Sequence, residues 1–266
     1  LKSSMVGARP KPILARPWVN IQSPTDVTHM PSWLGIKQQK YAHSLFSKGV
    51  QSHPLLVSET LYKMKSITPQ VAFAGRSNVG KSTLLNMLIH GVPDPIPKHL
   101  SERKKLDRPT AAPVSHKPGR TRHVFRFEVG GSLTLVDLPG YGFARVTRRM
   151  RGSWAELIDN YLAQASNLQR VLSLVDAEVG VKESDEQLWE MLQAGNQQMM
   201  VVLTKADKVT PEGLNRTMAH VVSVLQDFDS ERVWPYVHAV SGLHGHGILE
   251  LRSSLGAIAS DFTLRA

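Results

Sequence analysis

From residue 70 onward, apolar and polar positions alternate in blocks that predict strands and helices in regular succession. Six segments have the apolar runs or the alternation typical of strands: 71–74, 123–129, 133–136, 171–175, 199–203 and 234–240. Five have helical patterns: 82–90, 153–166, 183–193, 211–226 and 247–259. This succession predicts an α/β fold with a mostly parallel six-stranded sheet and helices on both faces.

Local signals refine these boundaries. Gly130-Gly131 is typical of a hairpin turn between two strands. Ser153 and Glu156 have the spacing of a capping box, which predicts a helix start there. Pro211 favours the first position of another helix.

These patterns divide the chain into a domain with an extension. Residues 1–69 are predicted to form a basic, largely irregular extension, because five prolines interrupt its first half. Residues 70–260 form the domain, residues 91–120 an enlarged loop within it, and residues 261–266 a tail. The extension also carries four aromatic residues that either stack on RNA bases or anchor it on the protein surface. These are Trp18, Trp33, Tyr41 and Phe46.

Composition narrows the function classes. The hydrophobic content of 41% supports a core, and no stretch approaches the roughly 18 to 20 apolar residues of a membrane span. The absence of cysteine excludes disulfides and thiol catalysis. The net charge of +10 is uneven, with 24 Lys and Arg against 7 Asp and Glu in residues 1–151. This asymmetry favours a polyanionic partner such as RNA over ordinary solubility charge.

The stretch from Gly75 to Ser82 has the spacing of a phosphate-binding loop, G-x-x-x-x-G-K-S, between a predicted strand and helix. Glycines let the backbone N–H groups approach phosphate oxygens, and the helix N-terminus adds partial positive charge. Lys81 is expected to bridge the β- and γ-phosphates, and Ser82 to ligate Mg²⁺. The nucleotide-binding residues predicted here are Gly75, Arg76, Ser77, Asn78, Val79, Gly80, Lys81, Ser82 and Thr83.

Two further motifs follow predicted strands. Asp137-Leu138-Pro139-Gly140 is a D-x-x-G element, in which Asp137 reaches Mg²⁺ through water and the Gly140 N–H meets the γ-phosphate. Thr204-Lys205-Ala206-Asp207 places a carboxylate where it accepts hydrogen bonds from guanine but finds no matching donors on adenine. Ser241-Gly242 fits the remaining base-contact loop.

Gly119-Arg120-Thr121 precedes the hairpin. Thr121 is expected to close on Mg²⁺ and the γ-phosphate, so that order and disorder of this loop form the switch. With Lys81 and Gly140, Thr121 completes the residues predicted to act in catalysis.

Together these motifs resemble the EngB (YihA) branch of small GTPases over about residues 70–258. The resemblance rests on Gly-Arg-Ser-Asn-Val-Gly-Lys-Ser, Pro-Gly-Arg-Thr, Asp-Leu-Pro-Gly-Tyr-Gly-Phe-Ala and Thr-Lys-Ala-Asp. It implies a Ras-like P-loop GTPase domain, GTP or GDP with Mg²⁺ as ligands, and a role in large ribosomal subunit assembly. The implied partners are rRNA-containing precursors, ribosomal proteins and other assembly factors. Separately, the missing membrane span and the basic composition favour a protein that does not bind membranes, and the free protein is expected to be monomeric.

The sequence departs from this branch in three places. The stretch before Pro118 is longer than usual, Ser241-Gly242 replaces Ser-Ala, and the basic extension exceeds what a bacterial member needs. The first residues are basic, serine-containing and poor in acids, and the chain starts at Leu1, as expected after processing or trimming. This start favours a mitochondrial (matrix) location; a tail without targeting value and a bacterial-type cytoplasmic protein are the alternatives.

Tyr141 stands where Ras-like proteins have a water-positioning Gln, so slow intrinsic hydrolysis is expected. Asn78 either helps to hold a K⁺ ion beside the phosphates, as similar GTPases imply, or only shapes the loop. The alternative sources of positive charge beside the phosphates are Arg76, Arg120 and Arg122.

Basic residues next to the switches are the predicted RNA contacts, acting on phosphates rather than bases. They are Arg103, Lys104, Lys105, Arg145, Arg148, Arg149 and Arg151. Two other functions stay open: a module that holds GTP structurally without turnover, and a GTPase acting at a membrane or in ion transport.

Overall fold

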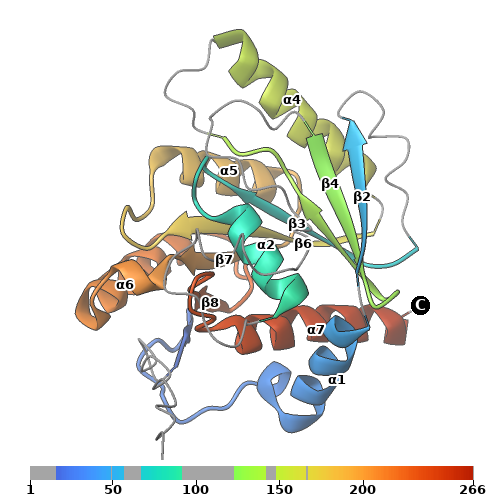
Figure 1. Ribbon diagram of the computed structural model, residues 1–266. Helices are drawn as coiled ribbons and strands as arrows, with labels where there is room; N and C mark the ends of the chain where they lie inside the picture. Colours follow the sequence, from blue (N-terminus) through green and yellow to red (C-terminus); the bar gives the residue numbers. More distant parts are fainter. Residues whose placement is uncertain are drawn as a thin grey trace, which may run out of the picture.

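A computed structural model of the chain describes residues 16–48, 50–56, 67–91, 123–141, 148–165 and 167–265. Its sheet has eight strands in the order β1-β8-β7-β6-β3-β5-β4-β2 (Figure 1). The strands are β1 (Trp18–Asn20), β2 (Val50–Leu56), β3 (Gln70–Gly75), β4 (His123–Val129), β5 (Leu133–Asp137), β6 (Leu168–Asp176), β7 (Met199–Thr204) and β8 (Tyr236–Ala239). Strands β5, β3, β6, β7 and β8 run parallel, whereas β4, β1 and β2 pair antiparallel.

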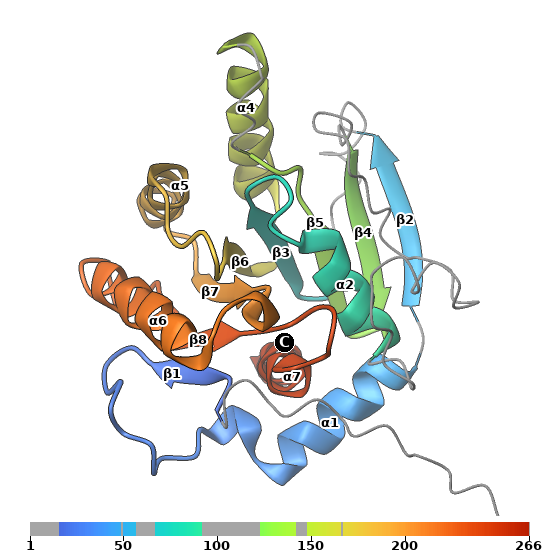
Figure 2. The same cartoon turned by 60° about the vertical axis from the view of Figure 1, so that its left-hand side comes forward.

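Helices cover both faces of this sheet (Figures 1 and 2). They are α1 (Ile36–Ser47), α2 (Lys81–His90), α4 (Arg148–Gln164), α5 (Glu183–Ala194), α6 (Pro211–Leu225) and α7 (Ile248–Arg265), with short 3-10 turns η1 (Ser32–Leu34) and η3 (Ala206–Lys208). Because side chains alternate along a strand, Ala72 packs with α4, α5 and α6, whereas Val71 and Phe73 pack with α1, α2 and α7.

All six strands predicted from the sequence are present, and the α/β fold is confirmed. The two additional strands come from the extension, which was predicted to be largely irregular. Strand β1 is too short to show a pattern, and β2 contains Pro54, which an edge strand tolerates because one side of its ladder is open. Residues 16–56 are therefore more regular than predicted, and they extend the sheet at both edges.

The aromatic residues of the extension anchor it on the domain. Trp18 and Trp33 are 6% and 3% exposed and pack edge-to-face on each other and on Tyr236 of β8. Phe46 is also buried, beneath the guanidinium of Arg252. Of the two sequence-based alternatives, anchoring is correct for these three side chains, because buried rings cannot stack on RNA bases.

Two predicted boundaries are wrong. Helix α4 begins at Arg148, so Ser153 lies inside the helix and its spacing to Glu156 is not a capping box. Helix α7 continues to Arg265, so most of the predicted tail is helical. Thr210, by contrast, caps α6 by accepting a hydrogen bond from the Gly213 N–H, with Pro211 at the start as predicted.

Candidate nucleotide-binding site

The predicted phosphate-binding loop connects the end of β3 to the first residue of α2. Gly80 has φ of +107° and Asn78 has φ of +63°, so the loop turns through left-handed conformations just before the helix. A Cβ at Gly75 would lie 2.9 Å from Val79 Cγ1 and 3.0 Å from Leu174, which leaves room only for glycine. The N-terminus of α2 therefore lies at the end of this loop, and phosphate binding uses such a helix start.

Asp137 ends β5 next to this loop, and its carboxylate interacts electrostatically with the Lys81 amine. Asp137 is 4% exposed, and its Oδ1 has no hydrogen-bond partner among the described residues. Burial raises the pKa of Asp137 from 3.8 to about 6, although Lys81 lowers it. Burial also lowers the pKa of Lys81, with Asp137 opposing that shift. A buried oxygen without a partner fits a Mg²⁺ site, where a cation would satisfy it.

The pH dependence of the free energy of unfolding tests whether burial disfavours the ionised Asp137 carboxylate. Because the folded-state pKa of Asp137 is raised, the fold favours the protonated carboxyl, and ionisation between pH 3.8 and about 6 destabilises it. We expect the ligand-free protein to lose about 2 kcal/mol relative to Asp137→Asn between about pH 4.5 and 7. Urea unfolding of both proteins measures this difference, and a difference that does not change with pH would contradict it.

Gly140 lies directly against the phosphate-binding loop. A Cβ there would lie 3.0 Å from Lys81 Nζ and 3.2 Å from the Ser77 backbone nitrogen. The next residue, Tyr141, forms a parallel bridge with Arg76; its N–H donates to the Gly75 carbonyl at 3.3 Å, and its carbonyl accepts from the Ser77 N–H at 2.9 Å. The segment predicted to sense the γ-phosphate is therefore held beside Lys81.

The base-contact motifs reach the same edge of the sheet. The Thr204 hydroxyl donates to the Val79 carbonyl at 2.6 Å, which ties the end of β7 to the phosphate-binding loop. Lys205 pairs with Asp176 of β6 at 2.6 Å, and Asp207 follows in η3. A Cβ at Gly242 would lie 3.1 Å from Thr83 Cγ2, so the Ser241-Gly242 loop lies against the start of α2. Because the parallel strands end together, the structure brings these motifs to one site.

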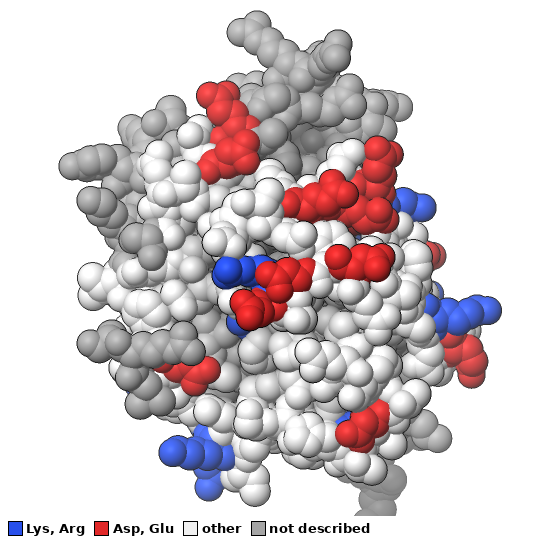
Figure 3. Space-filling model, turned by 180° about the vertical axis from the view of Figure 1, so that it is seen from behind, with Lys and Arg blue, Asp and Glu red and all other residues white. Residues whose placement is uncertain are grey.

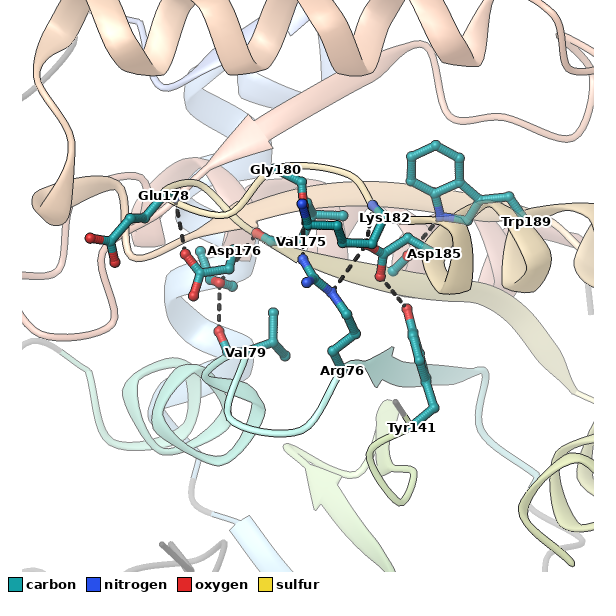
Figure 4. Close-up of polar contacts among 12 residues, drawn as sticks. Arg76, Val79, Tyr141, Val175, Asp176, Glu178, Gly180, Lys182, Asp185 and Trp189 are labelled. Carbon is teal, nitrogen blue, oxygen red and sulfur yellow. Dashed lines mark hydrogen bonds and ion pairs between the residues drawn. The ribbon is translucent and has the colours of Figure 1, made fainter. Parts of the chain in front are cut away.

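Asp185 is a part of the site that sequence reasoning missed. It is fully buried at the start of α5 and contacts both Tyr141 and Arg76 (Figure 4). The Arg76 guanidinium also donates to the Gly180 carbonyl at 2.8 Å. In this conformation the Arg76 side chain is thus committed to Asp185, and it does not serve as the alternative charge on the phosphates. The only sequence signal was the acidic start of a helix, which is common at any helix N-terminus.

Several predicted residues lie outside the described residues. These are Gly119, Arg120, Thr121, Arg103, Lys104, Lys105 and Arg145. Arg148, Arg149 and Arg151 lie in the first turns of α4, and their side chains are not described.

Comparison with known proteins shows the family of this chain. Residues 70–205 match the family model described as "50S ribosome-binding GTPase". The probable GTP-binding protein EngB of Granulibacter bethesdensis is 38% identical over 71% of this chain and 76% of its own length. The Rickettsia bellii protein of the same name is 37% identical over 70% of this chain and 78% of its own length.

Solved structures agree on the fold alone. The crystal structure of a probable GTP-binding protein engB has a TM-score of 0.52 and 22% identity, covering 72% of this chain and 99% of that one. A structure of Era in complex with MgGDPNP and nucleotides 1506–1542 of 16S ribosomal RNA also has a TM-score of 0.52, with 21% identity over 72% of this chain and 56% of that one.

The fold and the site define a P-loop GTPase, with GTP or GDP and Mg²⁺ as its ligands. Within that class, the chain belongs to the EngB family.

Proposed function

We propose that this GTPase acts as a switch in large ribosomal subunit assembly and that its GTP-bound form binds rRNA-containing precursors. The observation that carries the proposal is the attachment of Tyr141 to the phosphate-binding loop. Residues 142–151 follow directly and include Arg145, Arg148, Arg149 and Arg151. A change at the γ-phosphate would therefore move a strongly basic segment, which suits control of RNA phosphate contacts.

The described charges on one face of the molecule argue against RNA contacts there. On the face opposite to that of Figure 1, acidic side chains are more prominent than basic ones among the described residues (Figure 3). These acidic side chains would repel RNA phosphates. The family description and the 16S rRNA complex of Era are consistent with ribosomal RNA as the partner class.

Co-sedimentation with large-subunit precursors tests the proposal. We expect the protein to bind particles with a non-hydrolysable GTP analogue and to dissociate with GDP, and binding should weaken between about 50 and 200 mM salt. Arg148→Glu with Arg149→Glu should weaken binding and reduce the salt slope by about one per lost phosphate contact. Arg216→Glu, on the exposed surface of α6, is the matched control. Equal binding with both nucleotides would overturn the proposal.

Single-turnover hydrolysis separates the switch from a structural GTP-binding module. Slow hydrolysis that particles accelerate supports the switch, whereas an unchanged rate favours the module. The alternative function at a membrane has less support: within the described ranges, no helix combines the length and apolarity needed to cross a bilayer.

A bound K⁺ ion that assists hydrolysis is part of the proposal, with Asn78 as a ligand. Because Asn78 has φ of +63°, Asn78→Gly keeps the loop conformation accessible while removing the amide. We expect wild-type hydrolysis to be faster in K⁺ than in Na⁺ by on the order of tenfold, less than the effect of an arginine finger. Asn78→Gly should lose this difference. If it keeps the difference, Asn78 only shapes the loop.

The proposal also includes a mitochondrial location for this protein. Lys2, Arg9, Lys11 and Arg16 precede the first acidic residue, Asp26, as in segments that address proteins to mitochondria. Fractionation of cells, with detection of the endogenous protein, tests this location. Recovery of the protein outside mitochondria would contradict it.

A further inference from the structure

A fully buried carboxylate, Asp185, joins three segments of the nucleotide site (Figure 4). The Tyr141 hydroxyl donates to Asp185 Oδ1 at 2.8 Å, and the Lys182 N–H donates to Oδ2 at 2.9 Å. The Arg76 guanidinium forms an ion pair with Oδ2 at 3.1 Å. One carboxylate therefore connects the phosphate-binding loop, the residue after the D-x-x-G element and the start of α5.

The charges in this cluster fit together. Burial and the neighbouring Asp185 raise the pKa of Tyr141. The phenol therefore stays protonated, and its hydroxyl donates a hydrogen bond to Asp185. Burial also raises the pKa of Asp185, but the Tyr141 hydroxyl and the Arg76 cation oppose that shift. A buried carboxylate is costly unless donors satisfy it. Because the Tyr141 hydroxyl and the Arg76 cation both belong to the site, Asp185 holds both side chains in place through one hydrogen bond and one ion pair.

Tyr141 is fixed at both its backbone and its side chain. The backbone pairs with Gly75 and Ser77, and the hydroxyl reaches Asp185. Its chain neighbour Gly140 consequently has little freedom, and it lies where a Cβ would be 3.0 Å from Lys81 Nζ. These contacts hold the predicted γ-phosphate sensor beside Lys81.

We propose that Asp185 is a positioning residue that sets the preference for GTP over GDP, by holding Gly140 against Lys81 through Tyr141 and Arg76. This role of Asp185 rests on the proposed contact between the Gly140 N–H and the γ-phosphate. GDP has no third phosphate to meet Gly140, so a weaker contact at Asp185 costs binding energy only for GTP. An ordered donor binds more tightly because less conformational freedom is lost on binding.

Tyr141→Phe removes the hydroxyl and leaves the Arg76 and Lys182 contacts. The affinity for a non-hydrolysable GTP analogue should fall by about fivefold, the value of one hydrogen bond, while GDP affinity changes by less than about twofold. Titration with fluorescent GDP and GTP analogues in Mg²⁺ buffer gives both dissociation constants, and thermal unfolding checks the fold. The ratio of the two constants is the decisive readout, because a merely structural loss would weaken both nucleotides alike.

Tyr161→Phe is the matched control. Tyr161 is also fully buried, and its hydroxyl donates to Gln70 Oε1 at 3.4 Å, at the start of β3 rather than at its phosphate end. This variant should leave the ratio unchanged. Asp185→Asn should also lower GTP-analogue affinity more than GDP affinity, because a neutral amide accepts a weaker hydrogen bond from the Tyr141 hydroxyl. It provides the test if Tyr141→Phe does not fold.

An unchanged ratio in Tyr141→Phe, or a parallel loss of GDP and GTP-analogue affinity, would overturn the inference. Because the assay contains no RNA or ribosomal particles, its outcome is independent of the proposed role in subunit assembly.

Discussion

Asp207→Asn should weaken GTP binding by about two to three orders of magnitude, because the carboxylate predicted to accept two hydrogen bonds from guanine becomes an amide. Hydrogen bonds to a charged group contribute about 1.5–3 kcal/mol each, and the Asn nitrogen would face the guanine amino group, donor to donor. The structure places Asp207 in η3, where the Ala206 N–H donates to the Val240 carbonyl and fixes the turn. Competition binding with GTP, ATP and xanthosine triphosphate measures the change.

Xanthine carries a carbonyl where guanine carries the amino group, and this carbonyl can accept a hydrogen bond from the Asn amide. Asp207→Asn should therefore gain affinity for xanthosine triphosphate while its affinity for GTP falls. Asp227→Asn, on an exposed residue after α6, is the control and should bind GTP as the wild type does. If Asp207→Asn keeps its GTP affinity, the assignment of the base-contact motif is wrong.

Gly140→Ala should reduce GTP-analogue affinity and GTP hydrolysis by about 100-fold while leaving most GDP binding intact. The added methyl group would lie 3.0 Å from Lys81 Nζ and 3.2 Å from Ser77, so either Lys81 or the D-x-x-G segment must move. Contacts used only with the third phosphate are then lost, and such contacts are worth several kcal/mol in phosphoryl transfer. Isothermal titration and single-turnover hydrolysis test both parts.

Gly35→Ala is the control for the added methyl group. Gly35 has φ of −60°, and its new Cβ would lie 3.4 Å from the Ser32 carbonyl, an ordinary contact. This variant should bind and hydrolyse GTP normally. Equal losses of GDP and GTP in Gly140→Ala would show that the methyl group damages the whole site rather than the γ-phosphate contact.

The effects at Gly140 and Tyr141 should form a graded series. A methyl group at Gly140 displaces the sensor itself, whereas the loss of the Tyr141 hydroxyl only loosens it. Both substitutions should lower the affinity for the GTP analogue more than the affinity for GDP, because both alter the position of the same backbone segment, Gly140-Tyr141.

Most of the site was predictable because its residues come in short motifs at fixed spacings. A strand, a glycine-rich turn and a helix N-terminus are local in sequence, so Gly75 to Ser82 already predicted a phosphate-binding loop. The extension was harder to predict. Its strands are short or interrupted by Pro54, and they form only because the edges of a completed sheet offer unpaired hydrogen-bonding groups.

The sequence by itself determined the sheet strands of the domain, the class of nucleotide site and the residues expected to meet phosphate and base. Only the tertiary structure decided which side chains meet across the site: Tyr141 and Asp185 are 44 positions apart, and the Arg76 side chain turns toward Gly180, 104 positions away. Local periodicity carries no information about such contacts, because the order of strands in the sheet and the packing of α5 on it create them.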